Sequence, residues 1–146
     1  MKLQWELWRV TTYVFTVHAV LYRLLGGRLV GRNTMLLTTT GRRSGRARQT
    51  PLLYARDAHD YVIVASNGGE DRYPGWWHNI RHNPDVEVQV GRERFRCRAQ
   101  AARGADAARL WAKLTAIYGG YERYRQRTQR PLTVFRLTRR GGVAAP

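Results

Sequence analysis

The stretch 85–99 constrains the fold most, because it repeats with a period of two on both sides of a single glycine. Before Gly91 every second residue is valine, and after it every second residue is arginine. A period of two places one set of side chains on each face of a strand. The stretch therefore predicts two antiparallel strands, 85–90 and 92–99, in which Cys97 is a small core residue. The arginine row on the opposite face is either solvated or a docking surface for an anion.

The other elements follow from apolar runs and from the positions of glycine and proline. The predicted strands are 34–40, 46–56, 61–66, 85–90, 92–99 and 131–138. The predicted helices are 3–25, 75–82 and 107–118, with a short helical turn at 121–124. Pro51 argues for an edge strand or a bulge, the run 61–66 for a strand buried on both faces, and Asp106 for a helix cap. Antiparallel hairpins with inserted helices predict an α+β fold, and about six strands around a buried centre suggest a small barrel.

The first predicted helix, 3–25, carries leucine and valine at alternating spacings of four and three, which places them on one face. Tryptophan and tyrosine with flanking arginine suit the headgroup layer of a membrane, so an interfacial helix is one interpretation. Packing on its own domain or across a dimer is the other. We divide the chain into an N-terminal amphipathic helix (1–30), one barrel domain (31–140) and a frayed tail (141–146).

Arginine dominates the charge of the chain. Lysine and arginine together number 26 against 10 acidic residues, which gives a net charge of +16, and lysine occurs only at positions 2 and 113. Because arginine favours bidentate contacts with oxyanions, we expect nucleic acid, an acidic membrane surface or a polyanionic small molecule as partner. No reader helix, zinc finger or RNA-binding signature occurs, so nucleic acid is not expected. A single cysteine and no evident signal peptide fit a reducing, cytoplasmic compartment.

The segment 38–54 reads T-T-T-G-R-R-S-G-R-A-R-Q-T-P-L-L-Y and joins the first two predicted strands through a basic loop. Gly41 and Gly45 permit positive φ angles and let backbone N–H groups approach a ligand closely. Two arginines and a serine lie between them. Arginine forks, a hydroxyl and open N–H groups suit a phosphate or a carboxylate. A solvated hairpin tip is the alternative that this segment leaves open.

The sequence offers no catalytic set of side chains of its own. The two glycines of the basic loop are one residue too close for a Walker loop, and neither G-x-S-x-G nor H-E-x-x-H occurs. His78 and His82 have a spacing that could hold zinc, but no further cysteine, histidine or paired carboxylate supports them, so we predict no metal site. An anion-binding loop with many aromatic residues fits a protein whose chemistry belongs to a bound cofactor.

Several short motifs occur in a fixed order over residues 36–124. They are L-L-T-T-T-G-R-R-S-G (36–45), R-x-x-P-L-x-Y (48–54), V-A-S-x-G-G (64–69), P-x-W-x-x-N-I (74–80), N-P-x-V-x-V (83–88) and the cluster of Tyr118, Tyr121 and Tyr124. In this order the sequence resembles the deazaflavin-dependent nitroreductase family of actinobacteria, which uses coenzyme F420. The resemblance implies a split β-barrel like that of the FMN-binding pyridoxamine-phosphate oxidase group. It also implies an oxidoreductase that transfers a hydride from the reduced deazaflavin to a quinone, such as menaquinone, or to a nitro compound.

The resemblance implies roles for particular residues. The basic loop would hold the phosphate and glutamates of the coenzyme, the following strand would border its ring, and Trp76 would wall the pocket. The implied coenzyme contacts are Arg42, Arg43, Ser44, Arg48, Gln49, Thr50, Pro51, Leu52, Leu53, Val64, Ala65, Ser66, Asn67, Gly75, Trp76, Trp77, His78, Asn79 and Tyr121. The implied substrate-side residues are Ser66, Tyr118, Tyr121 and Tyr124. Leu53 stands where some nitro-reducing members have tyrosine, and Asn67 stands where lysine is frequent.

Other interpretations stay open at this point. An FMN-dependent enzyme and a non-catalytic carrier of the deazaflavin or flavin would use the same barrel. A basic module that binds nucleic acid is the alternative from another class. A homodimer, and peripheral contact with the anionic inner face of the cell membrane where menaquinone would be met, are compatible with the charge and the first helix.

Overall fold

The computed structural model describes residues 33–141. The predicted helix at 3–25 and nearly all of the predicted tail lie outside these residues. The strands are β1 (Thr34–Thr40), β2 (Ala47–Leu53), β3 (Ala55–Asp57), β4 (Asp60–Val64), β5 (Asp85–Val90), β6 (Glu93–Ala101) and β7 (Val134–Arg139). The helices are the 3₁₀ helix η1 (Asn67–Gly69) and the α-helices α2 (Gly75–His82), α3 (Gly104–Ile117) and α4 (Gly120–Arg127). Within 33–141 no helix is long and apolar enough to cross a bilayer.

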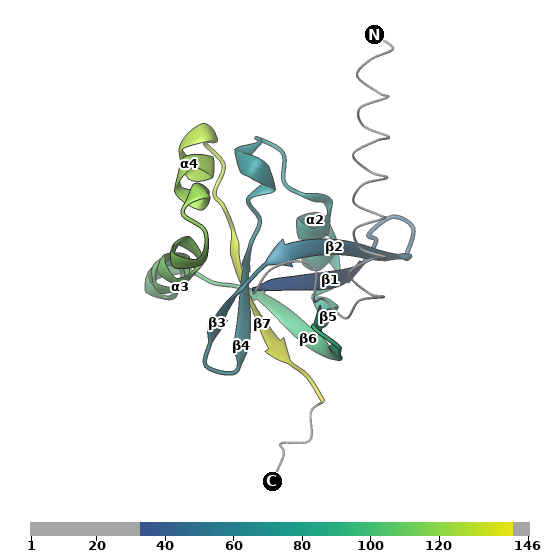
Figure 1. The fold of residues 1–146 in the computed structure, drawn as a ribbon. Coiled ribbons are helices and arrows are strands. Elements are labelled where there is room, and N and C mark those ends of the chain that lie inside the picture. The colour runs from purple at the N-terminus through teal and green to yellow at the C-terminus, as the bar shows by residue number, and fades with distance from the viewer. Residues whose placement is uncertain (1–32, 142–146) are drawn as a thin grey trace.

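The strands form one antiparallel sheet in the order β2-β1-β5-β6-β7-β4-β3 (Figure 1). β2 and β3 stand at opposite ends of this order, yet only Tyr54 separates them in the sequence. The sheet must therefore curl until its two edges meet at Tyr54, which produces a half-barrel. The N–H of Tyr54 extends the contact with β1, because it donates to the carbonyl of Asn33 at 2.9 Å.

Several boundaries differ from the prediction: β4 ends at Val64 rather than at 66, β6 continues to Ala101, and β7 begins at Val134 rather than at 131. The segment 46–56 is two strands, because the chain changes its pairing partner from β1 to β4 at Tyr54. The sheet has seven strands for this reason, where about six were expected. The helical turn predicted at 121–124 is the longer helix α4. The edge position predicted from Pro51 is confirmed, since β2 is the outermost strand of the order.

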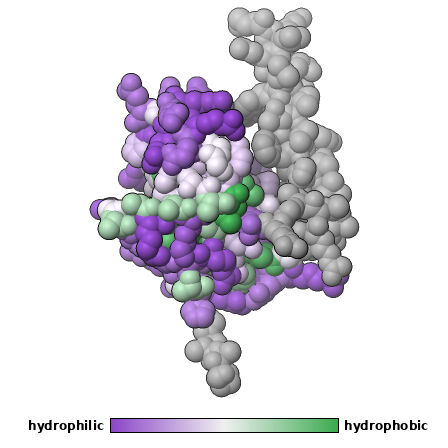
Figure 2. Space-filling view, turned by 60° about the vertical axis from the view of Figure 1, so that its left-hand side comes forward, coloured by the Kyte–Doolittle hydropathy of each residue, from purple (hydrophilic) through white to green (hydrophobic). Residues whose placement is uncertain are grey.

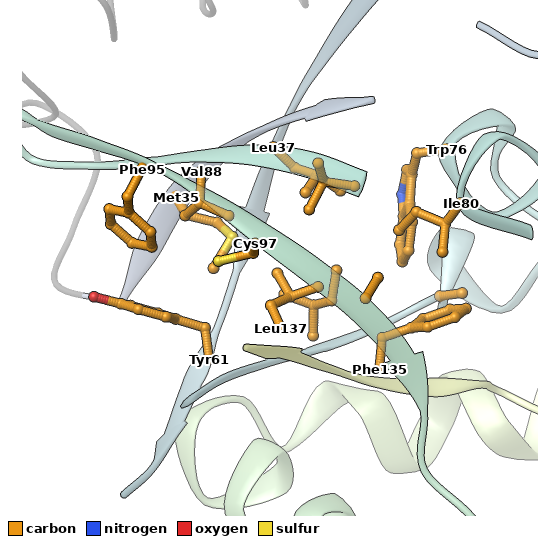
Figure 3. Packing of buried hydrophobic residues seen from close by; sticks show 14 residues of the cluster. Met35, Leu37, Tyr61, Trp76, Ile80, Val88, Phe95, Cys97, Phe135 and Leu137 are labelled. Atoms are coloured by element: carbon orange, nitrogen blue, oxygen red, sulfur yellow. The ribbon is translucent and has the colours of Figure 1, made fainter. Parts of the chain in front are cut away.

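Buried side chains form two clusters, one on each face of the sheet. The inner cluster combines residues from five strands with two from α2, and Figure 3 shows Cys97 within it. The outer cluster lies between β3, β4 and β7 and the helices α3 and α4, which Figure 1 places together on one side of the sheet. Strand β4 supplies both clusters: Tyr61 and Ile63 are inner, and Val62 and Val64 are outer. The predictions of a strand buried on both faces and of a core cysteine are thus confirmed.

An ion-pair network ties the β3–β4 hairpin to α3 and β7. Asp57 is buried and accepts hydrogen bonds from three basic side chains. They are Arg109 at 2.7 Å, Lys113 at 2.8 Å and Arg136 at 2.7 Å. These hydrogen bonds hold the pKa of the Asp57 carboxyl well below its usual range. The prediction that Asp106 caps α3 is wrong, because it lies within the first turn and binds Arg109 and Arg136 instead.

The side of the molecule that carries α3 and α4 is mostly hydrophilic. Figure 2 brings this side forward and shows hydrophilic residues over most of the described surface, with a narrow hydrophobic band across it. Among residues 33–141 the exposed large hydrophobic side chain is Ile117, at 38%. This side therefore presents no broad apolar docking face in the part of the chain that the structure describes.

Candidate functional site

The basic loop, residues 41–46, closes the hairpin between β1 and β2 with its own hydrogen bonds. The N–H of Gly41 donates to the carbonyl of Arg46 at 2.7 Å, and that of Gly45 donates to Gly41 at 2.8 Å. The N–H of Arg46 donates to Ser44 Oγ at 3.2 Å. Gly45 has a φ of 70°, which a glycine adopts without strain. The loop is therefore internally braced, and its arginine side chains are free to extend outwards.

Four arginines of this hairpin lie on the surface: Arg42, Arg43, Arg46 and Arg48 are all exposed. Within residues 33–141 no carboxylate forms an ion pair with any of them. Among the described residues no carboxylate neutralises these guanidinium groups, and each can bind an oxyanion in a bidentate manner. The structure thus brings the predicted arginines Arg42, Arg43 and Arg48 together on one hairpin, with Arg46 between them.

Helix α2 fixes the root of the basic loop through Asn79. This amide is buried, accepts a hydrogen bond from the N–H of Arg42 at 3.0 Å and donates one to Thr39 Oγ1 at 3.0 Å. His78 precedes it and is half-buried; its pKa is lowered by burial and by the positive charge of neighbouring arginines. His78 is accordingly neutral at pH 7. The sequence predicted both residues near the coenzyme, and the structure shows that Asn79 also holds the loop in place.

Strand β2 runs from the basic loop to the outer cluster. At about 3.3 Å per residue, Ala47–Leu53 spans about 20 Å. The last residues of the strand are partly exposed, with Leu52 packed against the inner cluster and Leu53 against the outer cluster. No strand within 33–141 pairs with the outer edge of β2, which can therefore offer main-chain groups to a ligand.

The V-A-S-x-G-G motif forms the turn after β4. Val64 and Ala65 are buried, whereas Ser66 is half-buried at the start of the turn. Three successive residues then have positive φ: Asn67 at 44°, Gly68 at 65° and Gly69 at 80°. A Cβ on Gly69 would lie 2.8 Å from both Cα and the carbonyl oxygen of Tyr124. The glycine therefore lets α4 pack directly on this turn.

Three tyrosines at the α3–α4 junction contact one another and the outer cluster. The hydroxyls of Tyr118 and Tyr124 lie 3.0 Å apart, and the ring of Tyr121 packs edge-on against Tyr118 at 5.1 Å. Burial raises the pKa of Tyr121 to about 12. The pKa of Tyr124 is also raised, chiefly by its hydrogen bond with Tyr118. Tyr121 and Tyr124 are therefore neutral at physiological pH, and they share the outer cluster with Leu53.

The two tryptophans of α2 differ in position. Trp76 is 5% exposed and packs edge-on against Phe135 in the inner cluster (Figure 3). Trp77 is half-buried, stacks on Tyr73 with ring centroids 3.7 Å apart, and donates from Nε1 to Thr133 Oγ1 at 3.1 Å. Trp76, which the sequence predicted as a pocket wall, thus has its ring in the core. Its role toward a ligand stays a prediction.

One residue of this region was missed by the sequence reasoning. Arg130 lies between α4 and β7, outside any motif, and its guanidinium donates to the carbonyls of Ala65, Ser66 and Glu70. These partners precede it by 60 to 65 residues, so no local pattern could have indicated the contact. Histidine, cysteine and carboxylate side chains form no group of three suited to a metal ion within 33–141.

Known proteins resemble this chain in sequence over most of its length. The sequence model of the F420H(2)-dependent quinone reductase family matches residues 14–139. An F420H(2)-dependent quinone reductase of Mycobacterium tuberculosis is 41% identical over 145 residues, which cover 94% of this chain and 97% of that protein.

Solved structures agree with this match. An F420-H2 dependent reductase is 34% identical with a TM-score of 0.68, over 73% of this chain and 94% of that one. A chain described as a domain-swapped dimer is 27% identical with a TM-score of 0.70, over 94% of this chain and 99% of that one. A Listeria innocua protein described as a pyridoxamine 5′-phosphate oxidase has a TM-score of 0.53 at 11% identity, over 75% of this chain and 85% of that one, and shares the fold alone. The predicted split barrel is thereby confirmed, and the chain belongs to the F420H(2)-dependent quinone reductase family.

Proposed function

We propose that this protein is an oxidoreductase that binds reduced coenzyme F420 along β2 and passes its hydride to a quinone beside the tyrosine cluster. The observation that carries the proposal is the course of β2. The strand begins at the basic loop, where the hairpin carries four arginines without an ion pair to a described carboxylate. It ends at Leu53, which packs against the same outer cluster as Tyr118, Tyr121 and Tyr124. An extended ligand with an anionic tail at one end and a reacting ring at the other fits this arrangement.

The hydrogen-bond donors at the start of β2 suit the anionic tail of the coenzyme. A phosphate and several glutamate carboxylates need multiple cationic donors, and Arg42, Arg43, Arg46 and Arg48 supply them without a competing carboxylate in the described chain. Asn79 holds the first of these arginines by its backbone, so less loop ordering is required on binding. When bound, the reduced deazaflavin supplies the hydride.

At the other end the chain orients the acceptor and stabilises its charge. Hydride transfer from a bound donor to a bound acceptor depends mainly on proximity and orientation. Negative charge develops on the quinone oxygen, and a neutral hydroxyl can stabilise it by donating a hydrogen bond. Tyr121 and Tyr124 stay protonated well above pH 7, so they serve as donors without a change of charge. Ser66, at the start of the adjoining turn, is a further donor.

Titration of the pure protein with F420 and with FMN tests the proposal. Each arginine that binds an anion through charge-assisted hydrogen bonds is worth about 1.5–3 kcal/mol, so Arg42→Ala and Arg43→Ala should each weaken F420 binding about tenfold or more. Arg92→Ala is the matched control, because Arg92 is exposed in the distant β5–β6 turn. Unchanged affinity in both loop variants would contradict the assignment of the basic loop. Tighter binding of FMN would favour the flavin enzyme.

Oxidation of the reduced coenzyme by menadione then separates enzyme from carrier. We expect turnover with menadione, and we propose menaquinone as the physiological acceptor and nitro compounds as slower ones. Binding without turnover would support a carrier.

The assembly and the location of the protein belong to the same proposal. A net charge of +16 supports contact with the anionic inner face of the membrane by a cytoplasmic protein, and a similar chain described as a domain-swapped dimer supports a homodimer. Sedimentation with anionic and with neutral vesicles tests the membrane contact, and light scattering tests the dimer.

A further inference from the structure

The guanidinium of Arg130 is bound by main-chain carbonyls from a distant turn. Its Nε donates to Glu70 at 2.8 Å, its Nη1 to Ala65 at 3.0 Å and its Nη2 to Ser66 at 2.9 Å. A longer bond of 3.4 Å joins Nη1 to Pro131. Arg130 forms no ion pair with a carboxylate of the described chain. The fork of this arginine thus serves to hold backbone rather than to neutralise charge.

The turn that Arg130 holds has an unusual backbone course, because Asn67, Gly68 and Gly69 all have positive φ. The two glycines adopt this conformation without strain, whereas Asn67 does so at a cost that the surrounding structure must offset. The carbonyls on either side of the run, Ser66 before it and Glu70 after it, both accept from Arg130. The guanidinium therefore spans this run of positive φ and fixes both of its ends.

Aromatic stacking also fixes the position of Arg130 itself. Its guanidinium lies 4.6 Å from the ring centroid of Tyr73, and Tyr73 stacks on Trp77 at 3.7 Å. Trp77 belongs to α2 and donates to Thr133, whose carbonyl accepts from the N–H of Ala65 at 2.9 Å. The end of β4, helix α2 and the segment before β7 are thus joined around one side chain, beside the turn on which α4 packs.

We propose that Arg130 is a positioning residue for hydride transfer, acting through the backbone of residues 65–70. By fixing this turn it sets the place of the Ser66 hydroxyl and the seat of α4, which carries Tyr121 and Tyr124. Arg130 itself contacts neither coenzyme nor quinone in this role. The inference rests on the proposed function, because the positioned groups are those assigned there to the quinone side.

The test compares Arg130→Lys and Arg130→Met with Arg92→Lys. Lysine keeps the charge but lacks the planar fork, so it cannot reach three carbonyls in the same geometry. We expect Arg130→Lys to keep its fold and to bind F420 within about threefold of wild type, since the basic loop is untouched. A misplaced group near the reacting centre can cost up to about 100-fold, so kcat for menadione should fall about tenfold or more. Hydrogen exchange of the amides of residues 66–70 should accelerate, and Arg92→Lys should change neither quantity.

The outcomes separate the two proposals. Accelerated exchange together with reduced kcat supports the positioning role. Wild-type kcat in Arg130→Lys overturns it, whether or not exchange accelerates, because a merely structural arginine would lower Tm and leave the kcat of the folded enzyme unchanged. If Arg130→Met does not fold, Arg130→Lys decides alone. Absence of F420 binding or turnover in the wild-type protein would overturn the proposed function instead.

Discussion

Gly69→Ala tests whether close packing of α4 on the turn after β4 builds the quinone side of the site. At Gly69 the φ of 80° disfavours any side chain, and an added Cβ would lie 2.8 Å from backbone atoms of Tyr124. Gly68 supplies a matched control, because its φ of 65° is similar but an added Cβ would meet nothing within 4 Å. The pair of variants therefore separates backbone strain, which both share, from the collision with α4, which only Gly69→Ala produces.

The expected magnitudes follow from this geometry. An alanine in the left-handed region costs about 1–2 kcal/mol, and this is the whole expected cost of Gly68→Ala. The contact at Gly69 is about 0.7 Å shorter than an ordinary carbon contact, and overpacking of this kind adds about 1–3 kcal/mol. At about 4 °C per kcal/mol, Tm should fall by about 4–8 °C in Gly68→Ala and by about 8–20 °C in Gly69→Ala. Because the colliding atoms are backbone, α4 must move as a unit and carry Tyr121 and Tyr124 with it.

Circular dichroism gives the two Tm values, and steady-state oxidation of reduced F420 by menadione gives kcat and KM at a temperature where both variants are folded. We expect Gly68→Ala to retain most of the wild-type kcat, whereas Gly69→Ala loses about tenfold or more. F420 affinity should change little in either variant, since the basic loop lies at the far end of β2. Equal Tm and equal kcat in the two variants would refute the reasoning, because the contact with Tyr124 would then have no consequence.

Three further predictions concern parts of the protein that support the site. Asp57→Asn should lower Tm at pH 7. Because the folded-state pKa of Asp57 is depressed, its ion pairs stabilise the protein above the unfolded pKa of about 4, and this stabilisation is lost as pH falls. The Tm difference between the variant and the wild type should therefore shrink in a series from pH 7 to pH 3. Asn79→Ala removes the hydrogen bonds to Thr39 and Arg42, at about 1 kcal/mol each, and should weaken F420 binding several-fold in a fluorescence titration without changing the kcat at saturation. Burial raises the pKa of Cys97 to about 11, so the native thiol should react with a disulfide reagent at pH 8 no faster than the protein unfolds; rapid reaction would place Cys97 outside the core.

Local patterns in the sequence determine much of the fold. The alternation around Gly91 predicted β5 and β6 and the core position of Cys97, and the apolar run after Asp60 predicted a strand buried on both faces. The break at Tyr54 could not be predicted in this way, because 46–56 reads as one strand. Only closure of the sheet shows that its two halves pair with different partners.

The candidate site likewise combines features that are local in the sequence with contacts between distant residues. The basic loop and the order of the motifs are local features, and they sufficed to indicate the family. The roles of Asn79 and Arg130 are tertiary, since each acts on backbone far away in the sequence. Asp106 shows that tertiary contacts can also overturn a local prediction. Its position in the sequence predicts a helix cap, but arginines from α3 and β7 bind its carboxylate instead.

Different residues hold the basic loop at one end of the candidate site and the tyrosines of α4 at the other. This difference bears on whether the protein is an enzyme or a carrier. Asn79 of α2 holds the basic loop, whereas the turn after β4, together with Arg130, holds α4 and its tyrosines. A carrier needs only the first end, because binding of an anionic tail does not depend on the placement of an acceptor. The turn at the second end has three successive residues with positive φ, and three of its carbonyls accept hydrogen bonds from a single arginine. Such a fixed geometry contributes nothing to gripping the tail, but hydride transfer to a quinone requires it. The support given to the tyrosine end therefore favours the enzyme.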